Sequence, residues 1–173
     1  MSLSVRVAHN EDISSLRQLI DQVVAFHYQE APTQFKDPAA VLSGAYLEER
    51  LADPQAIVLV AECNRAQVGV AVALIREAPP ILTPNRVVLV ENLAVEPRFR
   101  RTGVGRQLMD AAILWAQAQG ITELDLNVYE FNTDAIRFYE ALGFKTVSRR
   151  MRLSVEPYSP EARPDGNFQS EKA

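Results

Sequence analysis

The chain has 173 residues, 47% of them hydrophobic, and a formal net charge of −4 at pH 7, which fits one folded domain and argues against a dedicated nucleic-acid-binding protein. Its single cysteine excludes an intramolecular disulfide, and one cysteine with two histidines offers no familiar metal-binding spacing. No apolar run approaches the roughly 18 residues of a membrane span, and the N-terminal MSLSVRVAHNED lacks a signal-peptide core, so we expect a cytoplasmic protein without a membrane partner.

The first half of the chain predicts a short strand, two helices and a hairpin. Residues 5–7 alternate apolar and polar side chains, as a half-buried strand does. The stretches 13–27 and 41–51 repeat apolar residues at helical spacing. The apolar runs AIVLVAEC (56–63) and VGVAVALI (68–75) are separated by a short polar turn and predict an antiparallel hairpin.

The second half alternates strands with helices. The run RVVLVENLAV (86–95) is the most strand-like segment of the chain. A helix is expected over 103–119, a strand over 123–128 and a shorter helix over 133–142. Alternation over 144–154 predicts a final strand.

These elements predict a mixed α/β domain in which helices cover a central sheet. We expect residues 1–155 to form this single domain. Residues 156–173 are polar, contain Pro157, Pro160 and Pro164, and are predicted to be a C-terminal tail.

The stretch FRRTGVGRQLMDAAI (99–113) places two glycines and several arginines where a helix begins. A dinucleotide-binding fingerprint requires a third glycine where this chain has Leu108, and a Walker loop requires G-K-[ST] after its second glycine. What remains is R-x-x-G-x-G at a helix start, where unpaired backbone N–H groups and the helix dipole favour an anion. We favour a pyrophosphate site over the alternative, a tight turn with a solvated basic edge.

The segment ENLAVEPRFRRTGVGRQLM, followed by LNVYEFNTDAIRFYEALGF, resembles the two signature regions of the GNAT superfamily of N-acetyltransferases. The first matches the family pattern [RQ]-x-x-G-x-[GA] at Arg100, Gly103 and Gly105. The second matches at Asn132, Ala135, Tyr139, Gly143 and Phe144. The resemblance implies a GNAT-like fold: a central, mostly antiparallel sheet that is splayed at the cofactor site and flanked by helices.

The resemblance also implies acetyl-CoA as co-substrate, and the cysteine and histidine count leads us to expect no metal. Its pyrophosphate would lie on the backbone of residues 101–106, and its pantetheine arm along the end of the 86–95 strand, from which the 123–128 strand would diverge. The implied cofactor contacts are Leu93, Ala94, Val95, Arg100, Arg101, Thr102, Gly103, Val104, Gly105, Arg106, Asn132, Ala135 and Tyr139. For Asn132 a plain helix N-cap is an equally good interpretation, and both can hold.

Acetyl transfer to an amine needs a base near the acceptor and an acid near the thiolate. Glu91 interrupts an apolar strand, where a carboxylate is unfavourable without a partner, and is the candidate base, directly or through a water. Its alternatives are a solvent-facing Glu or one held by an arginine. Tyr139 is the candidate acid, by resemblance, and its alternative is a core tyrosine with a bonded hydroxyl.

The acceptor site is expected along the first two helices. The resemblance places it against the first two helices, where Phe26, Tyr28, Phe35 and Tyr46 lie among acidic residues that suit a cationic amine; an ordinary helix surface is the alternative. A small-molecule amine is the first expectation, and a protein N-terminus or lysine side chain the second. A non-catalytic acyl-CoA sensor is the third, and a homodimer is possible in each case.

Overall fold

The computed structural model describes residues 2–41, 43–81 and 83–155, which contain five strands and four α-helices. The strands are β1 (Leu3–Val7), β2 (Ala56–Cys63), β3 (Ala66–Glu77), β4 (Arg86–Val95) and β5 (Leu124–Leu126). The helices are α1 (Ile13–Glu30), α2 (Ser43–Ala52), α3 (Val104–Ala118) and α4 (Thr133–Ala141). All the predicted helices are therefore present, as are all the predicted strands but the last.

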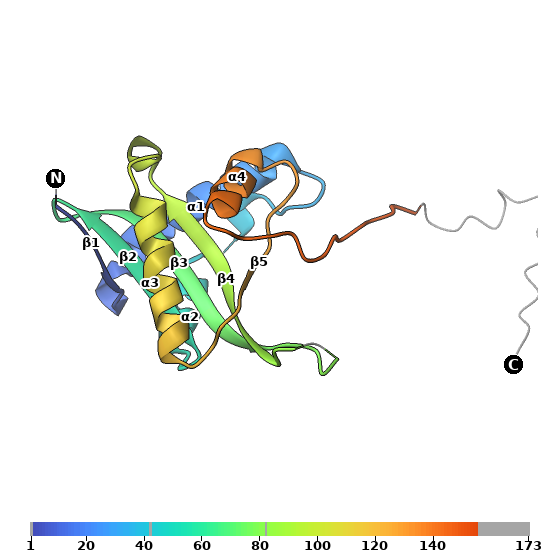
Figure 1. Ribbon diagram of the computed structural model, residues 1–173. Coiled ribbons are helices and arrows are strands. Elements are labelled where there is room, and N and C mark those ends of the chain that lie inside the picture. The colour runs from blue at the N-terminus through green and yellow to red at the C-terminus, as the bar shows by residue number, and fades with distance from the viewer. Residues whose placement is uncertain (1, 42, 82, 156–173) are drawn as a thin grey trace, which may run out of the picture.

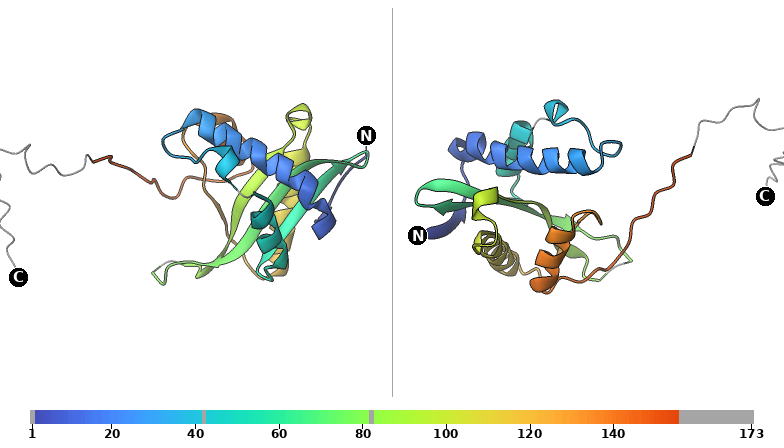
Figure 2. Two further views of the ribbon diagram at one scale, coloured as in Figure 1. Left: turned by 180° about the vertical axis from the view of Figure 1, so that it is seen from behind. Right: turned by 90° about the horizontal axis from the view of Figure 1, so that it is seen from above.

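The strands form one sheet in the order β1–β2–β3–β4–β5. The pairs β1–β2, β2–β3 and β3–β4 are antiparallel, which confirms the predicted hairpin between β2 and β3. Only β4 and β5 are parallel. Helices α1 and α2 cover one face of the sheet and α3 and α4 the other (Figures 1 and 2). The expected mixed α/β fold, with a mostly antiparallel sheet between helices, is confirmed.

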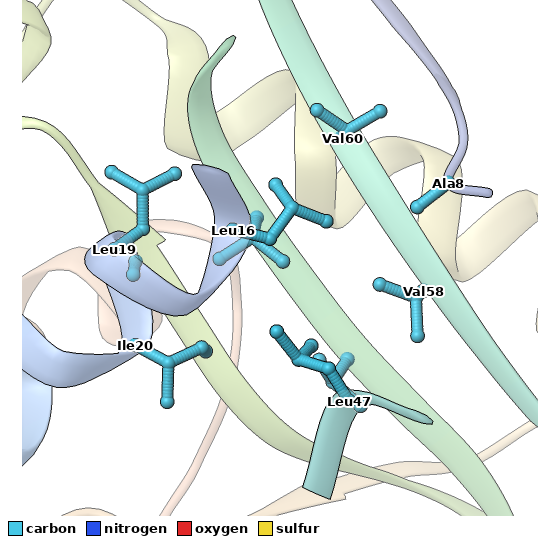
Figure 3. Close-up of a cluster of buried hydrophobic side chains, with 10 residues drawn as sticks. Ala8, Leu16, Leu19, Ile20, Leu47, Val58 and Val60 are labelled. Carbon is cyan, nitrogen blue, oxygen red and sulfur yellow. The ribbon is translucent and has the colours of Figure 1, made fainter. Parts of the chain in front are cut away.

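Strand β2 shows why the central strands are almost continuously apolar. Val58 and Val60 pack with α1 and α2 (Figure 3), whereas Leu59 and Ala61 pack with α3. Because successive side chains of a strand point to opposite faces, a strand covered on both faces must be apolar at every position. The helices contribute fully buried leucines to these two cores, among them Leu16, Leu47 and Leu108.

The prediction of a final strand over residues 144–154 is wrong. Within the described residues no strand follows α4, and the chain leaves the body of the domain after it (Figure 1). A strand needs a neighbour to pair its N–H and C=O groups, but this segment pairs with none of the described strands. The predicted strand over 123–128 is also shorter than expected, because β5 ends at Leu126.

Candidate functional site: a backbone cradle beside an open strand edge

The turn before α3 presents a row of backbone donors. It begins with a 3-10 turn at Pro97–Phe99, and both Arg101 (φ 63°) and Gly103 (φ 94°) adopt left-handed conformations. The first hydrogen bond of the helix joins the Gln107 N–H to the Gly103 carbonyl at 3.0 Å. Within the described chain, no hydrogen bond uses the N–H of residues 101–106. This arrangement can hold an anion, as the motif predicts.

The two glycines of the motif serve different purposes. A Cβ on Gly103 would meet no atom within 4 Å, so the positive φ, and not crowding, requires glycine there. A Cβ on Gly105 would lie 3.3 Å from Cζ of Phe138, so Gly105 lets α3 approach α4 closely. The sequence predicts bare backbone at both positions for the sake of the anion, and the structure adds a packing role at Gly105.

The side chains around the cradle are cationic and exposed. Arg100, Arg101 and Arg106 all lie at the surface. The Arg100 Nε donates to the Val95 carbonyl at 3.1 Å, which holds the Arg100 guanidinium against the end of β4. The Thr102 hydroxyl donates to the Phe99 carbonyl at 2.7 Å, so it stabilises the turn itself. The expected contact at Val104 is limited to the backbone, because its side chain is buried.

Strand β4 has an open edge next to this cradle. The β4–β5 ladder contains three residue pairs and ends where Val90 faces Leu126. Beyond it, Leu93, Ala94 and Val95 pair with β3 on one side and with no described strand on the other. The divergence of the two parallel strands, expected from the resemblance, is therefore present. Apart from the Val95 carbonyl, which accepts from Arg100, backbone groups on this edge are available to an extended, amide-bearing ligand.

Glu91 sits in a β-bulge where β4 leaves β5. Val72 and Ala73 of β3 pair with Asn92 and Val90, so Glu91 is an extra residue in β4. In a regular strand, adjacent side chains point to opposite faces, but the bulge allows Glu91 and Asn92 to reach the same phenol. The Tyr46 hydroxyl donates to Glu91 Oε2 at 2.9 Å and accepts from Asn92 Nδ2 at 2.8 Å.

An arginine completes this polar cluster. The Arg50 Nε donates to Glu91 Oε2 at 2.7 Å, while its Nη2 is 3.4 Å from Oε1, the less engaged oxygen. The guanidinium also lies 5.2 Å from the centroid of the Tyr46 ring, a cation–π contact. Burial raises the pKa of Tyr46, so its phenol remains a donor to the carboxylate. Glu91 is thus held by an arginine, and its role as a base remains a prediction.

The same cluster borders a cavity of about 290 Å³. Its polar lining comes from Tyr46, Glu91, Asn92 and Asn127, and its apolar lining from Leu89 and Val90. Since β5 ends one residue before Asn127, the cavity opens at the point where the two parallel strands separate. A small polar group can reach the Glu91 carboxylate there.

Helix α4 places Tyr139 near the diverging strands. Burial raises the pKa of Tyr139 to about 12, and its ring packs against Phe138 and Phe144. Its hydroxyl has no hydrogen-bond partner among the described residues. At the start of the helix, Asn132 Oδ1 accepts the Ala135 N–H at 3.2 Å, which confirms the N-cap interpretation and leaves the amide NH₂ available.

The four aromatic residues proposed for the acceptor do not form one group. Phe26 and Phe35 belong to an aromatic cluster with His27, Tyr129 and Phe131, which joins the end of α1 to the β5–α4 loop. Tyr46 lies apart from it, bonded to Glu91. Tyr28 is half-buried and belongs to neither group. Ring centroids in the cluster lie as close as 4.8 Å, so the rings stabilise one another.

Sequence reasoning missed several residues of the site. Three of them complete the cluster at Glu91 and its cavity: Arg50, Asn92 and Asn127. A partial signal existed, because Arg50 follows Tyr46 at the i, i+4 spacing that places two side chains on one helical face. Tyr129 and Phe131 were also missed, although they directly follow a predicted strand.

In ranges 2–41, 43–81 and 83–155, no three His, Cys, Asp or Glu side chains come together in a way that could hold a metal ion. Among the helices of those ranges, none is long and apolar enough to cross a membrane.

A ribosomal protein bS18-alanine N-acetyltransferase from Salmonella typhimurium is 41% identical over 70 residues, which are 38% of this chain and 47% of that protein. The chain thus spans about half the length of the curated relatives it matches. A mutant BH1408 protein from Bacillus halodurans superposes with a TM-score of 0.83 at 25% identity, covering 88% of this chain and 99% of that one.

A third comparison concerns a protein with a ligand. AAC(6')-Iy, in complex with the bisubstrate analogue CoA-S-monomethyl-acetylneamine, superposes with a TM-score of 0.70 at 25% identity. The superposition covers 91% of this chain and 100% of that one. The model of the Acetyltransferase (GNAT) family matches residues 20–144, well over half of the sequence. The chain therefore belongs to the GNAT family of acetyltransferases.

Proposed function

We propose that this protein is an N-acetyltransferase that transfers the acetyl group of acetyl-CoA to a primary amine of a small molecule. The observation that carries the proposal is the run of unpaired backbone N–H groups at residues 101–106, beside the open edge of β4. Membership of the GNAT family supports it. So does the similarity to AAC(6')-Iy, which was crystallised with a CoA-based bisubstrate analogue.

The residues present fit acetyl-CoA. The amides of residues 101–106 would hold the pyrophosphate, with Arg100, Arg101 and Arg106 supplying positive charge. The open edge at Leu93, Ala94 and Val95 would hold the pantetheine amides. The NH₂ group of Asn132 and the first turn of α4 at Ala135 would contact the same arm. Bound there, acetyl-CoA supplies an activated acetyl thioester. We expect no metal to take part.

Glu91 is the candidate base of this site. An amine with a pKa of about 10 is mostly protonated at neutral pH and must lose a proton before it attacks. Arg50 and Tyr46 occupy Oε2, so Oε1 is the oxygen that can receive the proton, through a water in the adjacent cavity. The carboxylate, paired with Arg50 at 2.7 Å, also offers a negative group that would attract an ammonium group to the cavity.

Tyr139 is the candidate acid. Because burial raises its pKa to about 12, the phenol is protonated at any physiological pH. Its unpartnered hydroxyl can donate to a thiolate as the carbon–sulfur bond breaks. This role depends on α4 facing the gap between β4 and β5, where Tyr139 and Asn127 line one hollow.

A cavity of about 290 Å³ with mostly polar side chains favours the amine of a small molecule over an amine on the surface of a protein. A protein N-terminus is the second candidate, because the relative at 41% identity is named a ribosomal protein bS18-alanine N-acetyltransferase. The aromatic cluster around Phe26 and Phe35 would flank either acceptor. We expect the protein to act in the cytoplasm.

Release of free CoA thiol from acetyl-CoA tests the proposal across small amines, aminoglycosides and peptides with N-terminal alanine. We expect turnover with a small amine, and a fall in kcat of about 10²–10⁴-fold for Tyr139→Phe, with CoA affinity little changed. Tyr28→Phe is the matched control, since it removes a phenol from outside both groups. Turnover with the peptide alone would favour the second candidate. CoA binding without any turnover would favour the non-catalytic sensor.

A further inference from the structure

We propose that the hydrogen-bond network at Glu91 makes the adjacent cavity selective for a primary ammonium group, with Asn92 as a specificity-determining residue. This selectivity rests on the proposed function and deepens it, because it states which chemical feature of the amine is recognised. The cavity of about 290 Å³ is lined by four polar side chains, those of Tyr46, Glu91, Asn92 and Asn127. The direction of each hydrogen bond among them decides whether a ligand meets donors or acceptors.

The single proton of the Tyr46 hydroxyl is used by Glu91. Glu91 Oε2 accepts from this hydroxyl at 2.9 Å and from Arg50 Nε at 2.7 Å. Burial raises the pKa of Tyr46, so the phenol keeps its proton. A phenol has one O–H to donate, and its oxygen can otherwise only accept. The second partner of Tyr46 must therefore be a hydrogen-bond donor.

This requirement fixes the orientation of the Asn92 amide. Its Nδ2 donates to the Tyr46 oxygen at 2.8 Å, so the NH₂ group points to Tyr46 and Oδ1 points elsewhere. Turning the amide over would place its oxygen against an oxygen that has no proton left to give. Among the described residues, no hydrogen bond uses Asn92 Oδ1. This oxygen is therefore available as an acceptor in the cavity.

The polar lining consequently presents acceptors to a ligand. Glu91 Oε1 has only a long contact of 3.4 Å with Arg50 Nη2, and Asn92 Oδ1 is unpaired. The Asn127 amide makes no hydrogen bond with the described residues and can turn its oxygen toward a ligand. Three acceptors match the three N–H groups of a primary ammonium, whereas a hydroxyl supplies one donor and a quaternary ammonium none. Charge assistance strengthens each of these hydrogen bonds.

Charge attraction alone would not produce this selectivity. One face of the Tyr46 ring is already occupied by the Arg50 guanidinium, 5.2 Å from its centroid, so this face is not free for a cationic ligand. Methylation of an amine keeps its positive charge but removes its N–H donors one at a time. A series of N-methylated amines therefore separates recognition of donors from attraction of charge.

NMR titration at pH 7 tests the proposal with three probes: propylammonium, N-methylpropylammonium and N,N-dimethylpropylammonium. All three are cationic at this pH, because an amine has a pKa of about 10. The side-chain amide signals of Asn92 and Asn127 and the Arg50 Nε–H report binding. We expect the Kd to rise roughly tenfold with the first methyl group and again with the second, as one charge-assisted hydrogen bond is lost each time. Equal binding of the three amines to the wild type overturns the proposal, and this comparison needs no variant.

Asn92→Leu keeps the volume of the side chain and removes its acceptor. We expect it to bind propylammonium roughly tenfold more weakly, and to lose less than the wild type does on the first methylation. Asn85→Leu is the matched control, because Asn85 is exposed before β4 begins and does not line the cavity; its affinities should equal those of the wild type. Wild-type affinity for propylammonium in a folded Asn92→Leu, checked by circular dichroism, would also overturn the proposal.

The titrations are run without CoA and with free CoA, which has no acetyl group to transfer, so turnover does not enter the measurement. Selective binding of propylammonium by a protein that releases no thiol with any amine would refute the proposed function and support the selectivity. Turnover combined with equal binding of the three amines would support the proposed function and refute the selectivity.

Discussion

Replacing Gly103 by alanine tests whether the conformation of the turn before α3 is what holds the cofactor. The residue has φ 94°, where an L-residue with a Cβ costs about 1–2 kcal/mol relative to glycine. A Cβ there meets no atom within 4 Å, so the effect of this substitution is conformational and not steric. If the turn keeps its shape, the free energy of unfolding falls by that amount. If the turn relaxes, the same free energy is lost from CoA binding, a roughly 5- to 30-fold weaker Kd.

The measurement is calorimetric CoA titration together with thermal unfolding, with and without saturating CoA. For a chain of this size, each 1 kcal/mol corresponds to roughly 2–4 °C in Tm. Gly120→Ala is the matched control, because Gly120 has φ 70° and open space around it but lies beyond the opposite end of α3. We expect Gly120→Ala to lower Tm and leave the CoA Kd unchanged. If Gly103→Ala changes neither the Tm nor the Kd for CoA, the proposal that the turn before α3 holds CoA is refuted.

Three further predictions concern other parts of the molecule. Asp12 is buried and bonded by Arg6 at 2.8 and 2.9 Å, which lowers its pKa; its stabilisation is therefore present above its unfolded pKa of about 3.9 and is lost as the pH falls below that value. Because Arg6 is partly exposed and keeps Glu62 as a partner, Asp12→Asn should cost about 1–2 kcal/mol near pH 7 and flatten this acid dependence in urea unfolding, whereas parallel curves for the two proteins would contradict the assignment. Asn132→Ala should lower the free energy of unfolding by about 1 kcal/mol and Asn132→Asp by less, because aspartate can still cap α4; equal losses in thermal unfolding would exclude capping. Burial raises the pKa of Tyr139 to about 12, so its phenol stays protonated up to pH 10. Any fall in the kcat of the wild type below pH 10 should therefore also be present in Tyr139→Phe.

Local sequence patterns predicted the elements that depend on neighbouring residues. The turn at 101–106 is such a case, because its glycines, its donors and the helix that follows are contiguous in the sequence. The central strands were equally predictable, since burial on both faces makes them apolar throughout. The 144–154 segment shows the limit of this reasoning. Alternation describes what a strand would bury, but it does not say whether a neighbour is present to pair with it.

The polar cluster at Glu91 depends on long-range contacts that no local pattern encodes. Arg50 reaches Glu91 from 41 positions away, across the packing of α2 on the sheet. The sequence showed that the Glu91 carboxylate needs a partner, because it interrupts an apolar strand. Which of the many arginines supplies that partner follows only from the tertiary structure. The bulge is similar, because one extra residue in β4 becomes visible only when its pairing with β3 is known.

The site exists because strand pairing fails twice at the same level of the sheet. From Val88 to Val90, β4 is an ordinary central strand that pairs with β3 on one edge and with β5 on the other. At Glu91 the bulge re-aims its side chains toward α2, and past Leu126 the ladder to β5 ends. The first interruption brings a carboxylate to the wall of a cavity, and the second leaves backbone groups for an extended ligand. A residue inserted or deleted in β4 would shift the register beyond the bulge and separate these two features. We infer that the spacing from Glu91 to Gly103, more than any one side chain, fixes where an amine and a thioester could meet.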